Sequence, residues 1–365
     1  MLKKKINLLK QFKNKKVLVT GHTGFKGSWL CAWLSLIGAN VIGISIDKKN
    51  KKSHLNYLNF VKLKADYRFN ICQYTKVRNC ILKNKPDFIF HLAAQSLVGE
   101  ANKNPLFTWN TNLLGTINVL NSLRYLKNKC KAIIITSDKC YKNFEIKRGY
   151  RETDILGGID PYSASKASAE LAIKSYFEIF LKEKKNIKII SCRAGNVIGG
   201  GDWSKNRLVP DCIRAWSNMK IAKIKNPNST RPWQHVLEPL NAYLTLAAAL
   251  DKGYKINGES FNIGPTNKNS YKVIDLVKLM SKLWIGNKWR ISKKFSFKES
   301  NLLKLNSSKI KEKISWKPVL DFKKSVEFTV IWYKKFSKDT SQVNWETKNQ
   351  IVQYMKIKKI LKTDL

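Results

Sequence analysis

The stretch from Lys15 to Leu34, KKVLVTGHTGFKGSWLCAWL, constrains the fold more than any other part of the chain. It begins with the short apolar run 17–19, which is typical of a buried parallel strand. The turn TGHTGFKG follows, with glycines at 21, 24 and 27, and the apolar segment 28–37 after it has the pattern of a helix. A strand, a glycine-rich turn and a helix in this order predict a site for the pyrophosphate of a dinucleotide.

Each glycine of this turn has its own expected role. We expect Gly21 to make the tight turn, Gly24 to leave room for the phosphates, and Gly27 to let helix and strand pack closely. The pyrophosphate would bind backbone N–H groups at the positive end of the helix dipole. Glycine spacing is a weak signal by itself, and an ordinary strand-to-helix turn is the alternative.

A second apolar strand, 41–46, ends at Asp47, which lies about 20 residues after the last glycine. A carboxylate there accepts hydrogen bonds from both ribose hydroxyls of NAD and repels the additional phosphate of NADP. The sequence therefore favours NAD, although the lysines within 48–52 act against this preference.

With 365 residues, the chain is long enough for two domains and a large core. No run of about 18 apolar residues occurs, and the N-terminus lacks the apolar segment and cleavage site of a signal peptide. The seven cysteines form no CxxC pair, and the four histidines show no metal-binding spacing. We therefore expect a cytoplasmic protein with reduced thiols, no membrane partner and no metal.

The net charge of +44, from 69 Lys and Arg against 25 Asp and Glu, would suit binding to nucleic acid or to an anionic surface. The lysines are spread along the chain, however, and an AT-rich coding bias produces the same abundance of Lys, Asn and Ile. No nucleic-acid-binding module occurs in the sequence. We expect no dedicated nucleic-acid partner, whereas a doubly anionic sugar nucleotide would be attracted to this surface.

Strand and helix patterns alternate through the first half of the chain. Helical patterns near 28–38, 73–84, 107–127 and 163–184 separate strand patterns at 17–20, 41–46, 61–63, 87–91, 132–136 and 187–192. This alternation predicts an α/β fold with a doubly wound parallel sheet, that is, a Rossmann domain. We expect this NAD-binding domain to comprise residues 1–193 and 236–264, the latter with a helix at 238–250 and a strand at 260–263. Residues 194–235 and 265–365 would form a smaller α/β substrate domain.

The segment DPYSASK places Tyr162 and Lys166 four residues apart, so that both side chains lie on one face of a helix. A phenol has a pKa of about 10 and becomes a base near neutral pH when an adjacent ammonium stabilises the phenolate. The lysine can also donate a hydrogen bond to a nicotinamide ribose. Tyr-x3-Lys is common by chance, but here it opens the helix after the fifth strand, downstream of the glycine turn.

Further candidate ligand contacts lie at strand ends, where parallel strands present polar groups to a crevice. The segment TSDK (136–139) offers a hydrogen-bond donor, an acid and a possible base, with a solvated loop as the alternative. The small residues of LAAQ (92–95) would let a cofactor ring approach the backbone, although tight packing explains them equally well. Asp66 follows the third strand and is either an adenine contact or an ordinary loop acid.

The loops after residue 192 carry guanidinium, amide and aromatic groups in RAGNVIGGGDW (193–203), RLVPD (207–211) and RPWQH (231–235). Arginine suits a diphosphate because its planar fork pairs with two oxygens. A nucleotide base can stack on an aromatic ring. As surface loops alone, these segments would carry little information.

Together these motifs resemble those of the extended short-chain dehydrogenase/reductases, and within them the CDP-glucose 4,6-dehydratases. The resemblance rests on VTGHTGFKGSWL, HLAAQ, TSDKCY, GYRE, DPYSASK, RAGNVIGGGDW, RLVPDCIRA and RPWQHVLEP within residues 15–265, and on WKP…WY at 316–333. Lys139 in TSDKCY is discriminating, because the dTDP-glucose and GDP-mannose dehydratases usually have an acid at this position.

The resemblance implies an NAD-dependent lyase that converts CDP-glucose into a 4-keto-6-deoxy sugar nucleotide by internal hydride transfer, for deoxysugar and surface polysaccharide synthesis. It implies a homodimer formed through the helices at 107–127 and 163–184. The implied catalytic residues are Tyr162 with Lys166 as base, Ser137 polarising the sugar 4-oxygen, Asp138 as the acid for the leaving hydroxyl, and Lys139 as the C5 base or a positioning group.

The implied NAD contacts are Gly21, Thr23, Gly24, Phe25, Lys26, Gly27, Asp47, Asp66, Tyr67, Leu92, Ala93, Ala94, Gln95, Thr111, Tyr162 and Lys166. The implied sugar-nucleotide contacts are Gln95, Asn196, Arg207, Pro210, Arg231, Trp233 and His235. The family usually continues HLAAQ with Pro-Leu-Val-Arg-x-Ser-Tyr, whereas this chain has SLVGEAN at 96–102. A related dehydratase or epimerase for another sugar nucleotide, or a non-enzymatic NAD-binding scaffold, is the alternative.

Overall fold

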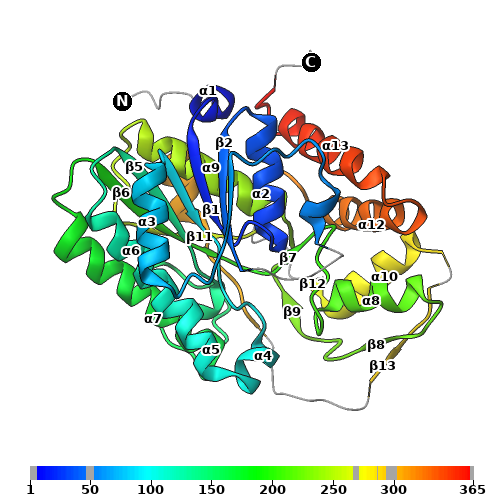
Figure 1. The fold of residues 1–365 in the computed structure, drawn as a ribbon. Helices are drawn as coiled ribbons and strands as arrows, with labels where there is room; N and C mark the ends of the chain where they lie inside the picture. Colours follow the sequence, from blue (N-terminus) through cyan, green and yellow to red (C-terminus); the bar gives the residue numbers. More distant parts are fainter. Residues whose placement is uncertain (1–5, 47–52, 266–270, 286, 293–301, 362–365) are drawn as a thin grey trace.

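A computed structural model of the protein describes residues 6–46, 53–265, 271–285, 287–292 and 302–361. Its centre is a seven-stranded sheet in the order β11-β6-β5-β4-β1-β2-β3, in which every neighbouring pair is parallel. Helices cover both faces of the sheet (Figure 1). The predicted α/β class and doubly wound parallel sheet are therefore confirmed.

Six of the seven strands lie where the sequence pattern predicts them. The strands are β1 (Lys16–Thr20), β2 (Asn40–Ser45), β3 (Ala65–Arg68), β4 (Phe88–His91), β5 (Cys130–Ile135), β6 (Ile187–Ala194) and β11 (Ser260–Ile263). The prediction for β3 at 61–63 is wrong, because the apolar Val61 and Leu63 pack against the core outside the ladder. The pairing of β2 begins with Ile42 opposite Ala65 and uses the polar edge segment ADYR instead.

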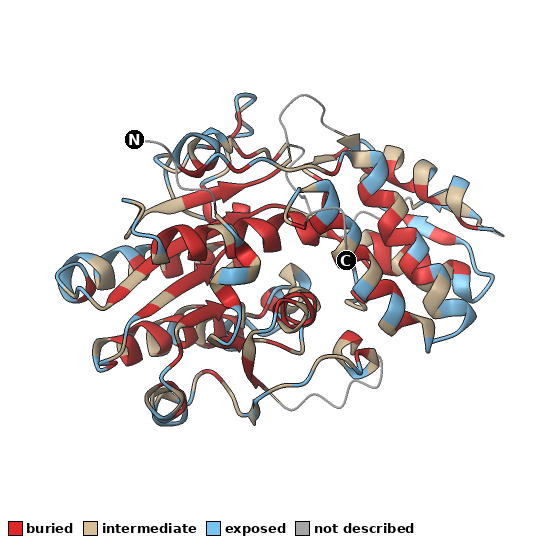
Figure 2. Cartoon of the chain, turned by 90° about the horizontal axis from the view of Figure 1, so that it is seen from above, coloured by how far each residue is buried: buried red, intermediate tan, exposed pale blue. Residues whose placement is uncertain are grey.

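Alternation along each inner strand divides the core into two layers. Leu18 faces the side covered by α3 (Tyr74–Asn84), α6 (Gly115–Arg124) and α7 (Pro161–Tyr176). Val17 and Val19 face the other side, covered by α2 (Phe25–Leu36) and α9 (Leu237–Asp251). Buried residues accordingly concentrate in the strands and in the helix faces turned toward them (Figure 2).

The long helical patterns of the sequence form as broken helices. The pattern at 107–127 comprises α5 (Pro105–Trp109), the π-helical turn η2 (Asn110–Leu114) and α6. The pattern at 163–184 comprises α7 and a second π-helical turn, η4 (Phe177–Leu181). α4 (Val98–Lys103) precedes α5, and the two helices lie beside α7.

A smaller group of elements lies to one side of the sheet (Figure 1). It comprises α8 (Leu208–Ser217), α10 (Val273–Leu283), α12 (Phe322–Lys338) and the two-stranded pairs β8 (Ala222–Ile224) with β13 (Trp289–Ile291), and β9 (Thr230–Arg231) with β12 (Tyr271–Lys272). The last helix, α13 (Gln342–Ile357), packs on α2, where the rings of Trp33 and Tyr354 meet edge to face. Among the described helices, none has the length and apolar character needed to cross a bilayer.

The remaining elements are short. They are α1 (Leu8–Phe12), η1 (His54–Tyr57), η3 (Asp138–Cys140), β7 (Val197–Ile198) paired with β10 (Gln234–His235), and α11 (Ser308–Ile314). Of these, η3 matters most for the site because it directly follows β5 at the carboxyl edge of the sheet.

The glycine turn between β1 and α2 is closed by backbone contacts that exclude side chains. Gly21 has a φ of 72° and a Cβ on it would lie 2.8 Å from the Ala93 nitrogen. A Cβ on Gly27 would lie 2.1 Å from the Gly21 carbonyl oxygen. The expected tight turn at Gly21 and the close packing at Gly27 are therefore present.

Gly27→Ala should lower the free energy of unfolding by about 2–3 kcal/mol, because the new methyl group can be accommodated only by moving α2 away from β1. Urea unfolding measures the loss. Gly99→Ala is the matched control: its Cβ would meet nothing within 4 Å in α4, so a gain of about 0.5–1 kcal/mol is expected. Equal stability of the two variants would contradict the packing role of Gly27.

Candidate active site

The helix α7 carries Tyr162 and Lys166 on one face, as their spacing predicts, and both side chains lie in the protein interior. Asp160 caps this helix by accepting a 3.0 Å hydrogen bond from the Ser163 nitrogen, and Pro161 fits the first turn. The cap fixes where the helix begins, and hence which face Tyr162 and Lys166 occupy. Both side chains are buried, on the side of α7 that meets η3.

Ser137 and Asp138 meet Tyr162 at the end of β5. The Ser137 hydroxyl donates a 3.0 Å hydrogen bond to Oδ1 of Asp138 and accepts one from the Lys139 nitrogen at 3.2 Å. Ser137 also lies close enough to Tyr162 to lower the pKa of its phenol. Oδ2 of Asp138 is buried and has no hydrogen-bond partner within the part of the chain that the structure describes. A buried carboxyl oxygen without a partner is available to a ligand.

Burial sets the ionisation of this cluster. It raises the pKa of Asp138, although Lys139, the Ser137 hydroxyl, Lys26 and Arg231 act in the opposite direction. A raised pKa makes Asp138 a better proton donor than an ordinary aspartate.

The pKa of Tyr162 differs from the expected value. Burial raises this pKa and outweighs the opposing effects of Ser137 and of the charge of Arg207. The prediction that Lys166 brings this pKa down toward neutrality is therefore wrong for the chain by itself, because removing the phenolate from water costs more than the nearby positive charges return.

Three cations surround the cluster. Burial lowers the pKa of Lys166 to about 8. The pKa of Lys26, which projects from the glycine turn, is also lowered to about 8, first by burial and then by Arg207 and Lys166. The charges of Arg207 and Lys166 both act on Lys26, so these cations lie near one another, and an anionic ligand among them would relieve their repulsion.

Arg207 joins two loops at the start of α8. Its Nη1 donates to Asp202 at 3.2 Å, and its Nη2 donates to the Ser96 carbonyl oxygen at 3.3 Å. Arg231 lies close enough to Asp138 to lower that residue's pKa. The two arginines predicted to bind a diphosphate therefore both border the site.

The glycine turn fits a dinucleotide. A Cβ on Gly24 would meet only the Gly21 carbonyl oxygen, at 3.2 Å, and no side chain caps α2. An uncapped helix N-terminus beside an open glycine is the arrangement that binds a pyrophosphate. Asp66 lies on β3, with its Oδ1 3.0 Å from Nε2 of His22 and its Oδ2 2.5 Å from Nη2 of Arg68. Asp47 lies outside the described residues.

Other predicted contacts lie around this turn or in the facing loops. Thr23, Phe25, Leu92, Ala93 and Ala94 are partly accessible near the carboxyl edge of the sheet, whereas Thr111 is buried in η2 with a hydroxyl lacking a hydrogen-bond partner in the described structure. On the facing side, Asn196 precedes β7, Pro210 is buried in the first turn of α8, and Trp233 is buried between β9 and β10. Lys139 is half-buried beside Asp138. No cluster of metal-ligating side chains occurs among the described residues.

Several predicted contacts have side chains engaged elsewhere. The Gln95 amide donates to the Leu97 carbonyl oxygen (3.0 Å) and to Thr108 (2.9 Å), and its oxygen accepts from the Leu97 nitrogen (2.5 Å), so this side chain holds its own loop. The Tyr67 hydroxyl accepts a hydrogen bond from Asn84. His235 is fully buried between the rings of Trp29 and Phe328, a position that does not support a substrate contact.

The clearest difference between the sequence interpretation and the structure concerns Arg193. The prediction that it begins a ligand-facing loop is wrong, since β6 extends through Ala194 and the guanidinium pairs with buried Glu170 at 2.7 Å. Sequence reasoning missed Glu170 altogether. Its position, four residues after Lys166 and eight after Tyr162, places all three on one face of α7, and this spacing could have revealed it.

A parallel Rossmann sheet with this Tyr–Lys pair beside a glycine turn defines the extended short-chain dehydrogenase/reductases. The family model described as GDP-mannose 4,6 dehydratase matches residues 18–329, and the chain belongs to that family.

Individual relatives agree with this assignment. The chain is 40% identical over 329 residues to the CDP-glucose 4,6-dehydratase of Salmonella typhimurium, covering 88% of this chain and 91% of the relative. It is 30% identical over 263 residues to the dTDP-D-glucose 4,6-dehydratase of Dictyostelium discoideum, covering 68% of this chain and 58% of the relative.

Solved structures share the fold. An epimerase from Methanothermobacter thermautotrophicus has a TM-score of 0.78 at 21% identity and covers 92% of this chain and 97% of its own. The dTDP-glucose 4,6-dehydratase from Bacillus anthracis, solved in complex with NAD, has a TM-score of 0.71 at 21% identity and covers 88% of this chain and 97% of its own.

Asp138→Asn should raise the melting temperature at pH 7.5 by roughly 2 °C or more. The folded state raises the pKa of Asp138 and so binds its proton more tightly than the unfolded chain does; stability is therefore lost as pH rises through the folded pKa. Asparagine removes this loss, and the two proteins should converge below about pH 4.

Asp339→Asn is the control of opposite sign. Hydrogen bonds from Ser341 lower the pKa of this exposed carboxyl, so its replacement should slightly destabilise the protein at pH 7.5. A fall in the melting temperature of Asp138→Asn at pH 7.5 would show instead that Lys139, Lys26 and Arg231 hold Asp138 in its ionised form.

Proposed function

We propose that the protein dehydrates CDP-D-glucose to CDP-4-dehydro-6-deoxy-D-glucose with NAD as its bound cofactor. The observation that carries this proposal is the convergence of Ser137, Asp138 and Tyr162 in one buried, cation-rimmed cluster next to the glycine turn. The 40% identity to the Salmonella typhimurium enzyme supports CDP-glucose as the substrate.

In the proposed reaction, Tyr162 removes the proton of the sugar 4-hydroxyl, and Ser137 donates a hydrogen bond to the same oxygen. Lys166, one helical turn from Tyr162, stabilises the phenolate and binds the nicotinamide ribose. When bound, NAD supplies a reversible acceptor for hydride, which leaves sugar C4 and returns to C6. Residues of the glycine turn, with Asp47, Asp66 and Thr111, would hold this cofactor.

Water loss requires an acid and a base on the sugar. Asp138 is suited to protonate the leaving 6-hydroxyl because burial raises its pKa and its Oδ2 is unpartnered among the described residues. The 4-ketone acidifies the C5 proton, and we assign its removal to Lys139, which directly follows Asp138; a purely positioning role for Lys139 is the alternative. Arg207 and Arg231 would bind the diphosphate of the sugar nucleotide, and Trp233 would contact its nucleotide. Lys26, in the glycine turn, would bind NAD.

Incubation with CDP-glucose should give a product lighter by one water in mass spectrometry, with the alkali-induced absorbance of a 4-keto sugar. Tyr162→Phe should lower kcat by about 10²- to 10⁴-fold, because the proton acceptor is lost. Tyr176→Phe is the matched control, since it makes the same change about 20 Å further along α7 and should leave kcat unchanged.

The substrate panel separates the alternatives. Product from dTDP-glucose, UDP-glucose or GDP-mannose but not from CDP-glucose would identify a related dehydratase. No product from any of them, together with salt-sensitive retention on DNA, would favour a non-enzymatic scaffold.

We also propose a homodimer formed through α5, η2, α6, α7 and η4. These neighbouring elements carry exposed apolar side chains, including Leu106 (72% exposed), Leu171 (58%) and Ile179 (72%). Exposed apolar side chains on neighbouring elements suit an interaction site.

The seven cysteines are all free thiols, which fits our assignment of the protein to the reducing cytoplasm.

Leu171→Glu should convert this dimer into monomers in size-exclusion chromatography with light scattering, because a buried interface cannot accommodate an unpaired carboxylate. Met219→Glu, which places the same charge on a 95% exposed position after α8, should leave the mass unchanged. A monomeric wild-type protein would refute the proposed assembly without bearing on the reaction.

A further inference from the structure

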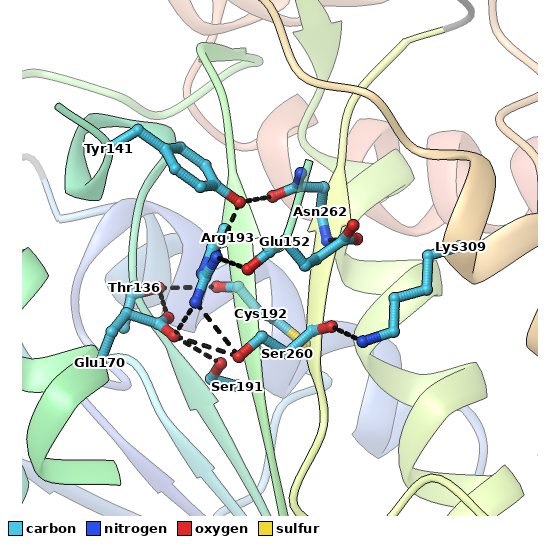
Figure 3. Close-up of polar contacts among 10 residues, drawn as sticks. All are labelled: Thr136, Tyr141, Glu152, Glu170, Ser191, Cys192, Arg193, Ser260, Asn262 and Lys309. Carbon is cyan, nitrogen blue, oxygen red and sulfur yellow. Dashed lines mark hydrogen bonds and ion pairs between the residues drawn. The ribbon is translucent and has the colours of Figure 1, made fainter. Parts of the chain in front are cut away.

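The carboxylate of Glu170 is buried at the junction of α7, β5 and β6 (Figure 3). Its Oε2 accepts hydrogen bonds from Arg193 at 2.7 Å and from the Ser191 hydroxyl at 2.9 Å. Its Oε1 accepts one from the Thr136 hydroxyl at 2.5 Å. Each donor comes from the sheet or its edge, so Glu170 connects the helix that carries Tyr162 and Lys166 to the strands beneath it.

Arg193 is held equally firmly on its other side. Its Nη1 donates to the Tyr141 hydroxyl at 2.8 Å and to the Glu152 carbonyl oxygen at 3.0 Å. The Tyr141 hydroxyl donates in turn to Asn262 on β11 at 2.7 Å (Figure 3). Because these contacts come from separate segments, neither member of the Glu170–Arg193 pair can move without breaking hydrogen bonds to several others.

This network keeps Glu170 ionised. Burial alone would raise its pKa, but the charge of Arg193 and the hydrogen bonds from Arg193, Thr136 and Ser191 lower it below the ordinary value. A fixed negative charge therefore persists inside the protein at neutral pH.

Lys166 lies one helical turn before this charge, and side chains four residues apart on a helix face are neighbours. Burial lowers the pKa of Lys166 to about 8, while Glu170 and the Cys140 sulfur on η3 act to raise it. Other titratable groups facing Lys166 are Tyr162, one turn earlier on α7, and Lys26 on α2 and His91 on β4, whose own pKa values Lys166 lowers. Arg193 on β6 is paired with Glu170 and opposes part of the effect of this carboxylate. Glu170 thus offsets part of the cost of burying a lysine among other cations.

The geometry points to Glu170 as a positioning residue for the proposed reaction: clamped by Arg193, Thr136 and Ser191, its carboxylate keeps the Lys166 side chain charged and α7 in register with the strand ends. The effect of Glu170 on catalysis rests on the proposed function. Its effect on the charge state of Lys166 does not, and that charge state can be measured separately.

The test is the titration of Lys166 in Glu170→Gln, measured by competitive acetic anhydride labelling with peptide mass spectrometry from pH 6 to 11. The amide keeps the size of the side chain but removes its charge, so the pKa of Lys166 should fall by about one pH unit or more. At pH 8 the charged fraction would then fall from about half to about a tenth, and kcat for CDP-glucose should fall about fivefold.

Ser191→Ala is the matched control, because it deletes one hydrogen bond to Glu170 and leaves the charge in place. It should lower the melting temperature slightly without moving the Lys166 titration. If Glu170→Gln does not fold, because Arg193 is left buried and unpaired, Glu170→Gln combined with Arg193→Met is compared with Arg193→Met alone. The difference between the two Lys166 titrations then isolates the charge of Glu170.

An unchanged Lys166 titration in a folded variant lacking Glu170 would overturn the inference and leave Glu170 with a structural role only. Lack of product from CDP-glucose with the wild-type protein would instead refute the proposed function. The lysine titration would stay interpretable in that case, so the two failures are distinguishable.

Discussion

A carboxylate and a guanidinium that scarcely touch water, Glu170 and Arg193, fix α7, the helix that carries Tyr162 and Lys166, on the sheet. Burying two such ions costs several kcal/mol each, and their attraction repays this only when every remaining donor and acceptor is also satisfied. Here Thr136, Ser191 and Tyr141 form the remaining hydrogen bonds with Glu170 and Arg193. The pair therefore contributes precise placement more than net stability, and it determines where Tyr162 and Lys166 stand relative to Ser137 and Asp138.

The electrostatic arrangement above this pair is unfavourable by itself. Lys26 and Lys166 both have pKa values lowered to about 8, while the pKa of Asp138 is raised. The chain therefore concentrates positive charge around a carboxylic acid in a place with little water. A diphosphate would stabilise this arrangement, because its negative charge would raise the pKa values of both lysines toward their ordinary range. The site therefore lowers the stability of the chain by itself, and an anionic ligand would restore it.

Local sequence patterns were sufficient to predict an element wherever the residues adjacent in sequence also determine its surroundings in the fold. The apolar runs of β1, β2 and β5 could be read directly, and so could the Tyr162–Lys166 spacing. β3 was misplaced because its polar segment is recruited by pairing with β2 rather than by burial. Arg193 was misjudged for a related reason: its partner Glu170 is 23 residues away in the chain, and only the folded structure brings the two together.

The segment 96–102, where this chain departs from the family pattern, meets the site through Arg207. That guanidinium reaches from α8 to the Ser96 carbonyl oxygen and also to Asp202, whose own carbonyl oxygen accepts a hydrogen bond from Tyr333. The side chain of the preceding Gln95 makes two hydrogen bonds with the Leu97 backbone and one with Thr108 on α5, so it ties the end of β4 to the start of this segment and to α5. Most of this segment forms α4, which packs beside α7. The altered residues therefore border both the Arg207 loop and the helix that carries Tyr162 and Lys166, where they can change sugar preference while Tyr162, Lys166, Ser137 and Asp138 stay in place.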